Sequence, residues 1–134
     1  MIYPMFVLVL LTFSILLLTL RVRIRSVQKG DIALNYFALM DGSEVPDIVT
    51  KTTRQVSNLF EVPVLFYVAG VLYLSLEVSS TLPVTFAWAF VAARFLHSCI
   101  HLTYNNVLHR VVAFGLGNLA VLAMWISIVM AVSD

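Results

Sequence analysis

The stretch RQVSNLFE, residues 54–61, runs without a break into the apolar segment VPVLFYVAGVLYL, residues 62–74. Arg54, Asn58 and Glu61 are spaced i, i+4 and i+7, so an α-helix places them on one stripe. An arginine, an amide and a carboxylate therefore point in one direction from a helix that is apolar enough for a membrane. Such groups are costly in hydrocarbon unless they face protein or a wet cavity, so the stripe predicts an internal polar site.

The composition of the chain indicates an integral membrane protein. Of its 134 residues, 61% are hydrophobic and only 11% are charged, whereas about a quarter are charged in a typical soluble domain. The net charge of +1 comes without a basic stripe or an RNA-binding motif, so we expect no nucleic-acid partner. A single cysteine, Cys99, excludes an intrachain disulfide and a cysteine-cluster metal site. No G-x-S-x-G, P-loop, dinucleotide or HExxH motif of a soluble enzyme is present.

Hydropathy predicts an all-α fold, a four-helix membrane bundle that forms one domain over residues 1–134. The expected helices cover approximately residues 2–22, 50–76, 84–105 and 107–132, with a polar loop over residues 23–49. In the first apolar run the basic residues come after the apolar ones, whereas a secretory signal has basic residues before them. We therefore interpret the run as a spanning helix. Pro63 predicts a kink in the second helix just after Glu61.

The third predicted helix ends in a second polar stripe. Arg94, His97, His101 and Tyr104 follow one another at spacings of 3, 4 and 3. The second helix is polar at its beginning and the third at its end, so antiparallel neighbours bring both stripes to one membrane face. Arg110, near the start of the fourth helix, belongs to the same face. Glycines later in the fourth helix are expected at close-packed positions, namely Gly115 and Gly117.

The first loop also sets the expected orientation. It carries or adjoins most basic residues outside the stripes, which are Arg21, Arg23, Arg25, Lys29 and Lys51. The positive-inside rule then places this loop and the polar site on the cytoplasmic side and both termini on the opposite side. Within the loop, residues 32–40 are either a short amphipathic turn at the membrane surface or a partly ordered loop.

Two interpretations of the intramembrane charges remain open. Arg54 and Glu61 can neutralise each other or partners on the third helix, as buried ion networks often do. Alternatively, Arg23, Arg54, Arg94 and Arg110 converge with Glu61 as the one obvious acid among them. That arrangement leaves an excess of positive charge at low dielectric. A small polyanion that also carries an ammonium group would balance it, with the ammonium at Glu61.

The two histidines of the third stripe have the i, i+4 spacing of paired metal ligands. No cysteine or paired carboxylate accompanies His97 and His101. We therefore expect no metal site and favour imidazoles that form hydrogen bonds or orient a ligand.

The runs Arg54-x3-Asn58-x2-Glu61-x-Pro63 and Arg94-x2-His97-x3-His101, together with the basic first loop, resemble the MAPEG family. These are membrane-associated proteins in eicosanoid and glutathione metabolism, including microsomal glutathione transferases and microsomal prostaglandin E synthase. The resemblance covers essentially the whole chain. It implies a homotrimer of four-helix protomers, with glutathione bound as cosubstrate between neighbouring subunits near the cytoplasmic face.

The resemblance also implies roles for individual residues. Arg110 matches the arginine thought to stabilise the glutathione thiolate and is the implied catalytic residue. His101 stands where eukaryotic members usually have a tyrosine, whereas Val111 and Phe114 replace a serine and a tyrosine of the prostaglandin synthase. These differences indicate a divergent bacterial-type member and argue against prostaglandin isomerisation. The implied glutathione-binding residues are Arg23, Arg54, Asn58, Glu61, Arg94, His97 and His101.

Three functions follow as hypotheses. The first is a glutathione transferase or peroxidase of the bacterial inner membrane, acting on lipophilic electrophiles or lipid hydroperoxides that enter from the bilayer. The second is a non-catalytic scaffold that binds lipid or glutathione; the family that the chain resembles includes a lipoxygenase-activating protein that presents lipid without conjugating it. The third is a small proton-linked transporter in which Glu61, Arg94 and the histidines form a relay.

Overall fold

A computed structural model describes residues 1–40 and 45–133, and these residues form helices and no strand. The helices are α1 (Ile2–Gln28), α2 (Tyr36–Leu39), α3 (Asp47–Leu59), α4 (Val62–Ser75), α5 (Leu82–Leu102) and α6 (Val107–Ser133). Four segments are long and apolar enough to cross a membrane: Ile2–Gln28, Asp47–Ser75, Leu82–Leu102 and Val107–Ser133. The prediction of an all-α protein with four spanning helices is confirmed.

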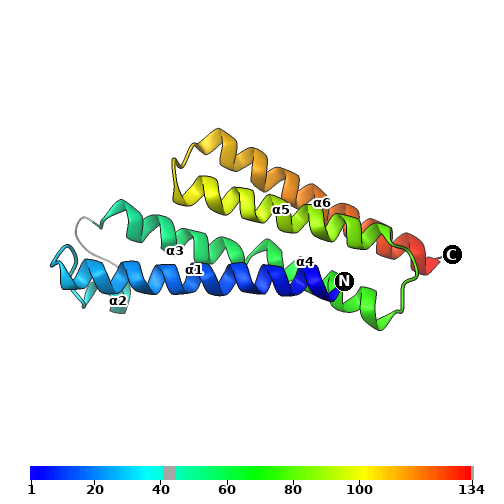
Figure 1. Cartoon of the computed structure of the whole chain (residues 1–134), viewed down its shortest axis with the longest axis horizontal. Coiled ribbons are helices and arrows are strands. Elements are labelled where there is room, and N and C mark those ends of the chain that lie inside the picture. The colour runs from blue at the N-terminus through cyan, green and yellow to red at the C-terminus, as the bar shows by residue number, and fades with distance from the viewer. Residues whose placement is uncertain (41–44, 134) are drawn as a thin grey trace.

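The two polar ends of the predicted stripes lie at the same end of the bundle. In Figure 1, α5 and α6 form an antiparallel pair, and α1 runs alongside α3 and α4. The connection from α1 to α3 and the turn between α5 and α6 lie at one end, whereas both termini and the α4–α5 connection lie at the other. The first of these ends, called the loop end below, carries the start of α3, the end of α5 and the start of α6.

The first helix is longer than predicted. It runs to Gln28 and not to residue 22, which shortens the predicted loop from its N-terminal side. Arg21, Arg25 and their neighbours are compatible with helix, and the chain turns only at Gly30, which has a left-handed φ of 77°. The second span also starts earlier than residue 50, because α3 begins at Asp47. Residues 41–44 of the predicted loop lie outside the described part of the chain.

The second span is broken at the position where a kink is predicted. The α3 helix ends at Leu59 and α4 begins at Val62, with Phe60 and Glu61 between them. Pro63 lies in the first turn of α4, where its missing N–H costs no helical hydrogen bond. Glu61 is the N-cap residue of α4, so its carboxylate lies at the positive end of the helix dipole. The break therefore gives the acid of the stripe a favourable electrostatic position.

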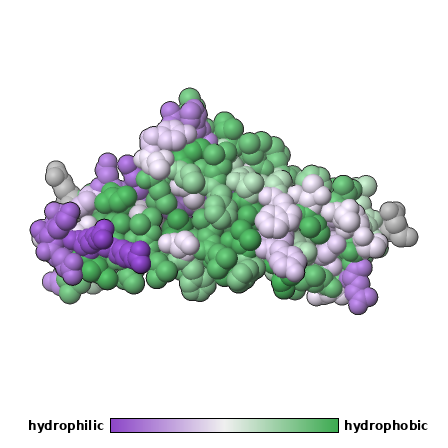
Figure 2. All heavy atoms as spheres, in the orientation of Figure 1, coloured by the Kyte–Doolittle hydropathy of each residue, from purple (hydrophilic) through white to green (hydrophobic). Residues whose placement is uncertain are grey.

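The bundle is held together by an apolar core in its middle. The rings of Phe66 on α4 and Phe90 on α5 stack with centroids 4.8 Å apart, and both side chains are fully buried. The indole N–H of Trp125 donates to the carbonyl of Leu65 over 3.1 Å and joins α6 to α4. Figure 2 shows a broad hydrophobic middle and a hydrophilic loop end, as expected for a surface that contacts lipid.

The predicted close packing of the two α6 glycines is half correct. A Cβ at Gly117 would lie 3.5 Å from the Cβ of Ala93, so this glycine packs against α5. A Cβ at Gly115 would meet nothing within 4 Å, so that prediction is wrong within the protomer. Among the glycines of residues 1–40 and 45–133, the tightest approach is at Gly70, where a Cβ would lie 2.6 Å from Sδ of Met5.

Candidate functional site

Arg94 is buried in the bundle, and only part of its guanidinium group has a hydrogen-bond partner among the described residues. Its side chain is 1% exposed, and its Cζ lies 4.9 Å from the ring centroids of both Phe90 and Phe114. Nη2 donates to Oδ1 of Asn118 over 3.4 Å, a contact that the sequence analysis missed. Nε and Nη1 have no hydrogen-bond partner among the described residues. Stacking on two aromatic faces stabilises the cation, but buried donors without partners are rare in folded proteins.

The α3 stripe does not lie on the buried face of α3. The buried side of α3 carries Val49, Thr52, Gln55 and Leu59. Gln55 donates from Nε2 to Oγ of Ser98 on α5 over 2.6 Å. Residues of the predicted stripe lie elsewhere on the second span, since Arg54 and Glu61 are exposed and Asn58 is half-buried. Part of the predicted site therefore faces outward from the single chain.

A polar cavity of about 140 Å³ lies at the loop end between α3, α5 and the start of α6. Its lining includes three cationic side chains, Lys51, Arg54 and Arg110, and a single acid, Asp47. His101 and Asn105 also contribute. The full lining of this polar cavity is Asp47, Thr50, Lys51, Arg54, His101, Asn105 and Arg110.

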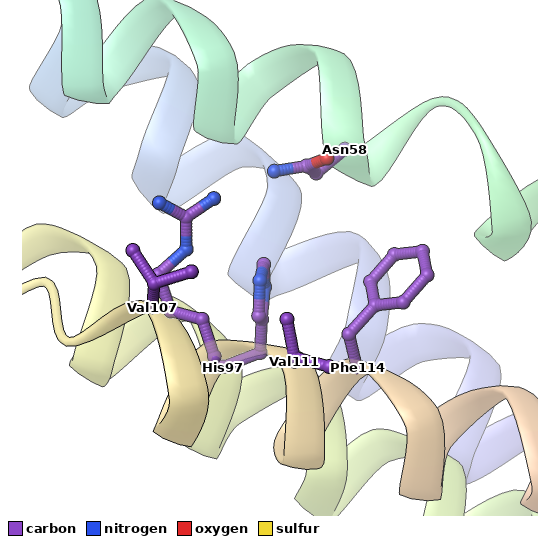
Figure 3. Close-up of a pocket in the computed structure, with 6 residues that line it drawn as sticks. Asn58, His97, Val107, Val111 and Phe114 are labelled. Atoms are coloured by element: carbon purple, nitrogen blue, oxygen red, sulfur yellow. The ribbon is translucent and has the colours of Figure 1, made fainter.

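A second cavity, of about 260 Å³, has mixed walls and also includes Arg110 in its lining. Figure 3 shows Asn58 on α3 lying across this mixed cavity from His97 on α5 and from Val107, Val111 and Phe114 on α6. The three α6 side chains provide an apolar wall. Arg110 is thus shared between the cation-rich polar cavity and the mixed cavity with its apolar wall.

A turn residue links two of the predicted site residues. Oδ1 of Asn105 lies 2.9 Å from Nδ1 of His101 and 2.9 Å from Nη1 of Arg110. Asn105 has a φ of 50°, and its N–H donates to the carbonyl of Ile100 over 2.8 Å. This role of Asn105 is not among those predicted from the sequence. The predicted third helix includes residue 105, whereas α5 ends at Leu102, so Asn105 lies in the turn. The available signal was its residue type, because asparagine adopts left-handed conformations more readily than most residues.

The two histidines of α5 are both buried and lie one above the other. The rings of His97 and His101 stack with centroids 5.9 Å apart and an interplanar angle of 17°. Nδ1 of His97 and Nε2 of His101 have no hydrogen-bond partner among the described residues. Within that part of the chain, no group of three histidine, cysteine or acidic side chains is arranged to hold a metal ion.

Arg23 and Glu61 lie outside both cavities. Nη2 of Arg23 donates to Oγ1 of Thr53 over 3.1 Å, and its Cζ lies 5.3 Å from the ring centroid of Phe37. It lines a separate, mainly apolar cavity between α1 and the α2 region. Glu61 lies exposed at the helix break and lines neither of the two cavities.

The predicted site residues therefore fall into groups. The side chains that line the two cavities are Arg54, Asn58, His97, His101 and Arg110. Arg94 lies behind Phe114, whose ring it contacts. Arg23 and Glu61 contribute to neither cavity in the single chain.

Comparison with known proteins agrees with the resemblance in the sequence. A family model described as the MAPEG family matches residues 1–130, which include α1 to α5 and most of α6. No curated protein and no solved structure matches the chain. The family match covers nearly the whole chain, including both polar stripes and Arg110. The chain belongs to the MAPEG family.

Proposed function

We propose that this protein is a membrane-bound glutathione-dependent transferase or peroxidase that acts on lipophilic electrophiles or lipid hydroperoxides. The MAPEG family includes glutathione transferases and related enzymes. The observation that carries the proposal is the position of Arg110, which lines both the cation-rich polar cavity and the mixed cavity with its apolar wall. A charged thiol cosubstrate and an apolar second substrate can meet at such a residue.

The charge around the polar cavity favours an anionic ligand. Lys51, Arg54 and Arg110 line this cavity with a single acid, Asp47. Deeper in the bundle, Nε and Nη1 of Arg94 have no partner among the described residues. Guanidinium groups bind carboxylates by charge-assisted and often bidentate hydrogen bonds. Glutathione has two carboxylates, one ammonium and a thiol. We assign its binding to Arg23, Arg54, Asn58, Glu61, Arg94, His97 and His101, with Glu61 as the partner of the ammonium.

Arg110 is the proposed catalytic residue. A cation beside a thiol favours the thiolate, which is the reactive nucleophile. In the transferase reaction the thiolate sulfur forms a bond to the electrophilic carbon, and the leaving group departs with its electron pair. With a hydroperoxide the sulfur attacks the terminal oxygen, the O–O bond breaks and the alkoxide takes a proton. A second glutathione then displaces hydroxide from the sulfenic acid, giving the disulfide and, after protonation, water.

The exposed stripe supports an assembly of several copies. Arg54 and Glu61 are exposed on the single chain, although they belong to a membrane-spanning segment. Charged groups in such segments normally face protein or a wet cavity. We therefore include a homotrimer in the proposal, in which a neighbouring copy completes each site. We further propose that the loop end faces the cytoplasmic side of a bacterial inner membrane, with both termini on the opposite side.

The proposal is tested by turnover of the purified full chain in liposomes with glutathione and 1-chloro-2,4-dinitrobenzene or a fatty-acid hydroperoxide. Arg110→Ala is expected to lower kcat/KM about 100-fold, the order found when one transition-state donor is removed. Arg25→Ala is the matched control, because Arg25 is exposed in the last turn of α1 and lines neither cavity. Equal activity in both variants, or no turnover of any electrophile or hydroperoxide by folded wild type, overturns the proposal.

A non-catalytic scaffold is the second candidate, and one observation favours it. Val111 and Phe114 line the mixed cavity beside Arg110 and offer no hydroxyl group to a reacting substrate. The wall they form suits an acyl chain. Saturable binding of glutathione or a fatty acid by wild type, with no product from either substrate class, is the result expected of a scaffold.

A further inference from the structure

We infer that Asn105 is a positioning residue of this site, acting through His101 and Arg110; the inference rests on the proposed function of Arg110. Asn105 lies in the short turn between α5 and α6, and its Oδ1 is 2.9 Å from a ring nitrogen of His101 on α5 and 2.9 Å from Nη1 of Arg110 on α6. One amide oxygen therefore ties together two of the predicted site residues across the turn.

The chemistry of the three groups fixes the direction of both hydrogen bonds. A guanidinium can only donate, so the atom facing Arg110 must be the amide oxygen, since the amide nitrogen would oppose donor to donor. The same oxygen has lone pairs and no proton, so Nδ1 of His101 must donate to it. Neutral His101 is consequently held in the Nδ1–H tautomer, with Nε2 as an acceptor. That Nε2 is buried and has no partner among the described residues.

The backbone of Asn105 is held in the turn independently of these two side-chain contacts. Asn105 has a φ of 50° and its N–H donates to the carbonyl of Ile100 over 2.8 Å, so its backbone is anchored to the end of α5. The neighbouring Asn106 has a different task. Its Oδ1 accepts the N–H of His109 over 3.1 Å and so caps the first turn of α6.

The consequence for the site concerns the direction of the Arg110 guanidinium. With Nη1 held by Asn105, the cation is kept at the boundary of the polar and mixed cavities, and its remaining donors are left for a ligand. Without the amide, the long side chain gains rotamers that place the charge away from a bound thiolate. The other charged groups of the polar cavity, Asp47, Lys51 and Arg54 on α3, would be unchanged.

Three variants isolate the amide from the backbone it sits on. Asn105→Gly removes the amide and keeps a backbone that accepts a positive φ. Asn105→Asp keeps an oxygen acceptor at the same place. Asn106→Gly is the matched control in the same turn, and glycine at an N-cap position costs little stability.

The first measurement is the set of ring ¹⁵N chemical shifts of His101 in detergent-solubilised, histidine-labelled full chain without glutathione. Wild type, Asn105→Asp and Asn106→Gly are expected to show a proton on Nδ1 of His101, and Asn105→Gly a mixture of tautomers. The second is thiolate absorbance of bound glutathione against pH. Its midpoint is expected to rise by about one pH unit in Asn105→Gly and to stay unchanged in Asn106→Gly, because the free energies of hydrogen bonds to charged groups are of that order.

Unchanged ring shifts and an unchanged midpoint in Asn105→Gly overturn the inference, as does loss of the Nδ1 proton of His101 in folded Asn105→Asp. The ring shifts need no glutathione, so they separate the two claims. If wild type forms no thiolate, the proposed function of Arg110 fails while the tautomer still decides whether Asn105 positions His101.

Discussion

Gln55 donates from its amide nitrogen to the hydroxyl oxygen of Ser98 over 2.6 Å, and both side chains are buried between α3 and α5. The hydroxyl of Ser98 in turn donates to the carbonyl of Arg94 over 2.8 Å. The second and third spans are therefore joined by a polar link directly beside the buried arginine. This link holds the α3 side of both cavities against α5.

The link is expected to contribute measurable coupling between Gln55 and Ser98. A double-mutant cycle with Gln55→Ala and Ser98→Ala should give a coupling free energy of unfolding of about 0.5–1.5 kcal/mol, as for other hydrogen bonds inside membrane bundles. The measurement is reversible unfolding in mixed micelles. Gln28→Ala, at an exposed position of α1, pairs with Ser98→Ala as the control cycle and should show no coupling. A coupling near zero in both cycles would contradict the role of the link.

Arg94 is expected to contribute to glutathione binding and not to the thermal stability of the fold. Replacing a buried charge by an apolar side chain of similar volume is often neutral or stabilising, so Arg94→Met should leave the Tm unchanged or raise it. Its affinity for glutathione should fall about tenfold or more, because charge-assisted hydrogen bonds are lost. Arg21→Met, at an exposed position of α1, is the matched control. A lower Tm with unchanged affinity would instead make Arg94 a structural residue.

Glu61 is expected to recognise the ammonium of the ligand. Glu61→Gln removes the charge with little change in shape, and glutathione affinity should fall while the affinity for an analogue without the amino group stays constant. Glu77→Gln is the control, since Glu77 is exposed in the connection between α4 and α5 at the far end of the bundle. Calorimetric titration of both variants with both ligands measures this difference. Equal losses for the two ligands would remove Glu61 from this role.

Gly70 is expected to set the distance between α4 and α1. A Cβ there would lie 2.6 Å from Sδ of Met5, whereas a Cβ at Gly115 would meet nothing within 4 Å. Gly70→Val should therefore lower the Tm, and Gly70→Ala should cost less because the Met5 side chain can move. Gly115→Ala should be neutral or stabilising by up to about 1 kcal/mol, the helix propensity difference. Thermal unfolding in one detergent compares the variants, and a Tm for Gly70→Val equal to wild type would refute the close approach.

Much of the fold could be predicted because its determinants are local in sequence. Long apolar runs give the four spans, and Pro63 gives the position where the second span breaks. The antiparallel order of neighbouring spans then brings the start of α3 and the end of α5 to one end. The predicted first helix is too short because three arginines after an apolar run suggest its end, although arginine is a good helix former.

The site was less predictable because sequence periodicity does not say which polar face of a helix turns inward. On α3 both faces are polar: one carries Arg54 and Asn58, the other Thr52 and Gln55. Only packing against Ser98 identifies the second as the buried face within the chain. The bridge made by Asn105 depends on the conformation of a short turn, and the contact of Arg23 with Thr53 depends on the angle between α1 and α3.

The most direct test of the central claim is a glutathione titration of the detergent-purified full chain, read by the ultraviolet absorbance of the thiolate. Wild type is expected to show saturable thiolate formation near neutral pH, where the thiol group of free glutathione is largely protonated. Arg110→Ala should bind glutathione but lose the thiolate signal, while Arg25→Ala should match wild type. Absence of a thiolate signal in wild type, or an equal signal in Arg110→Ala, would contradict the account.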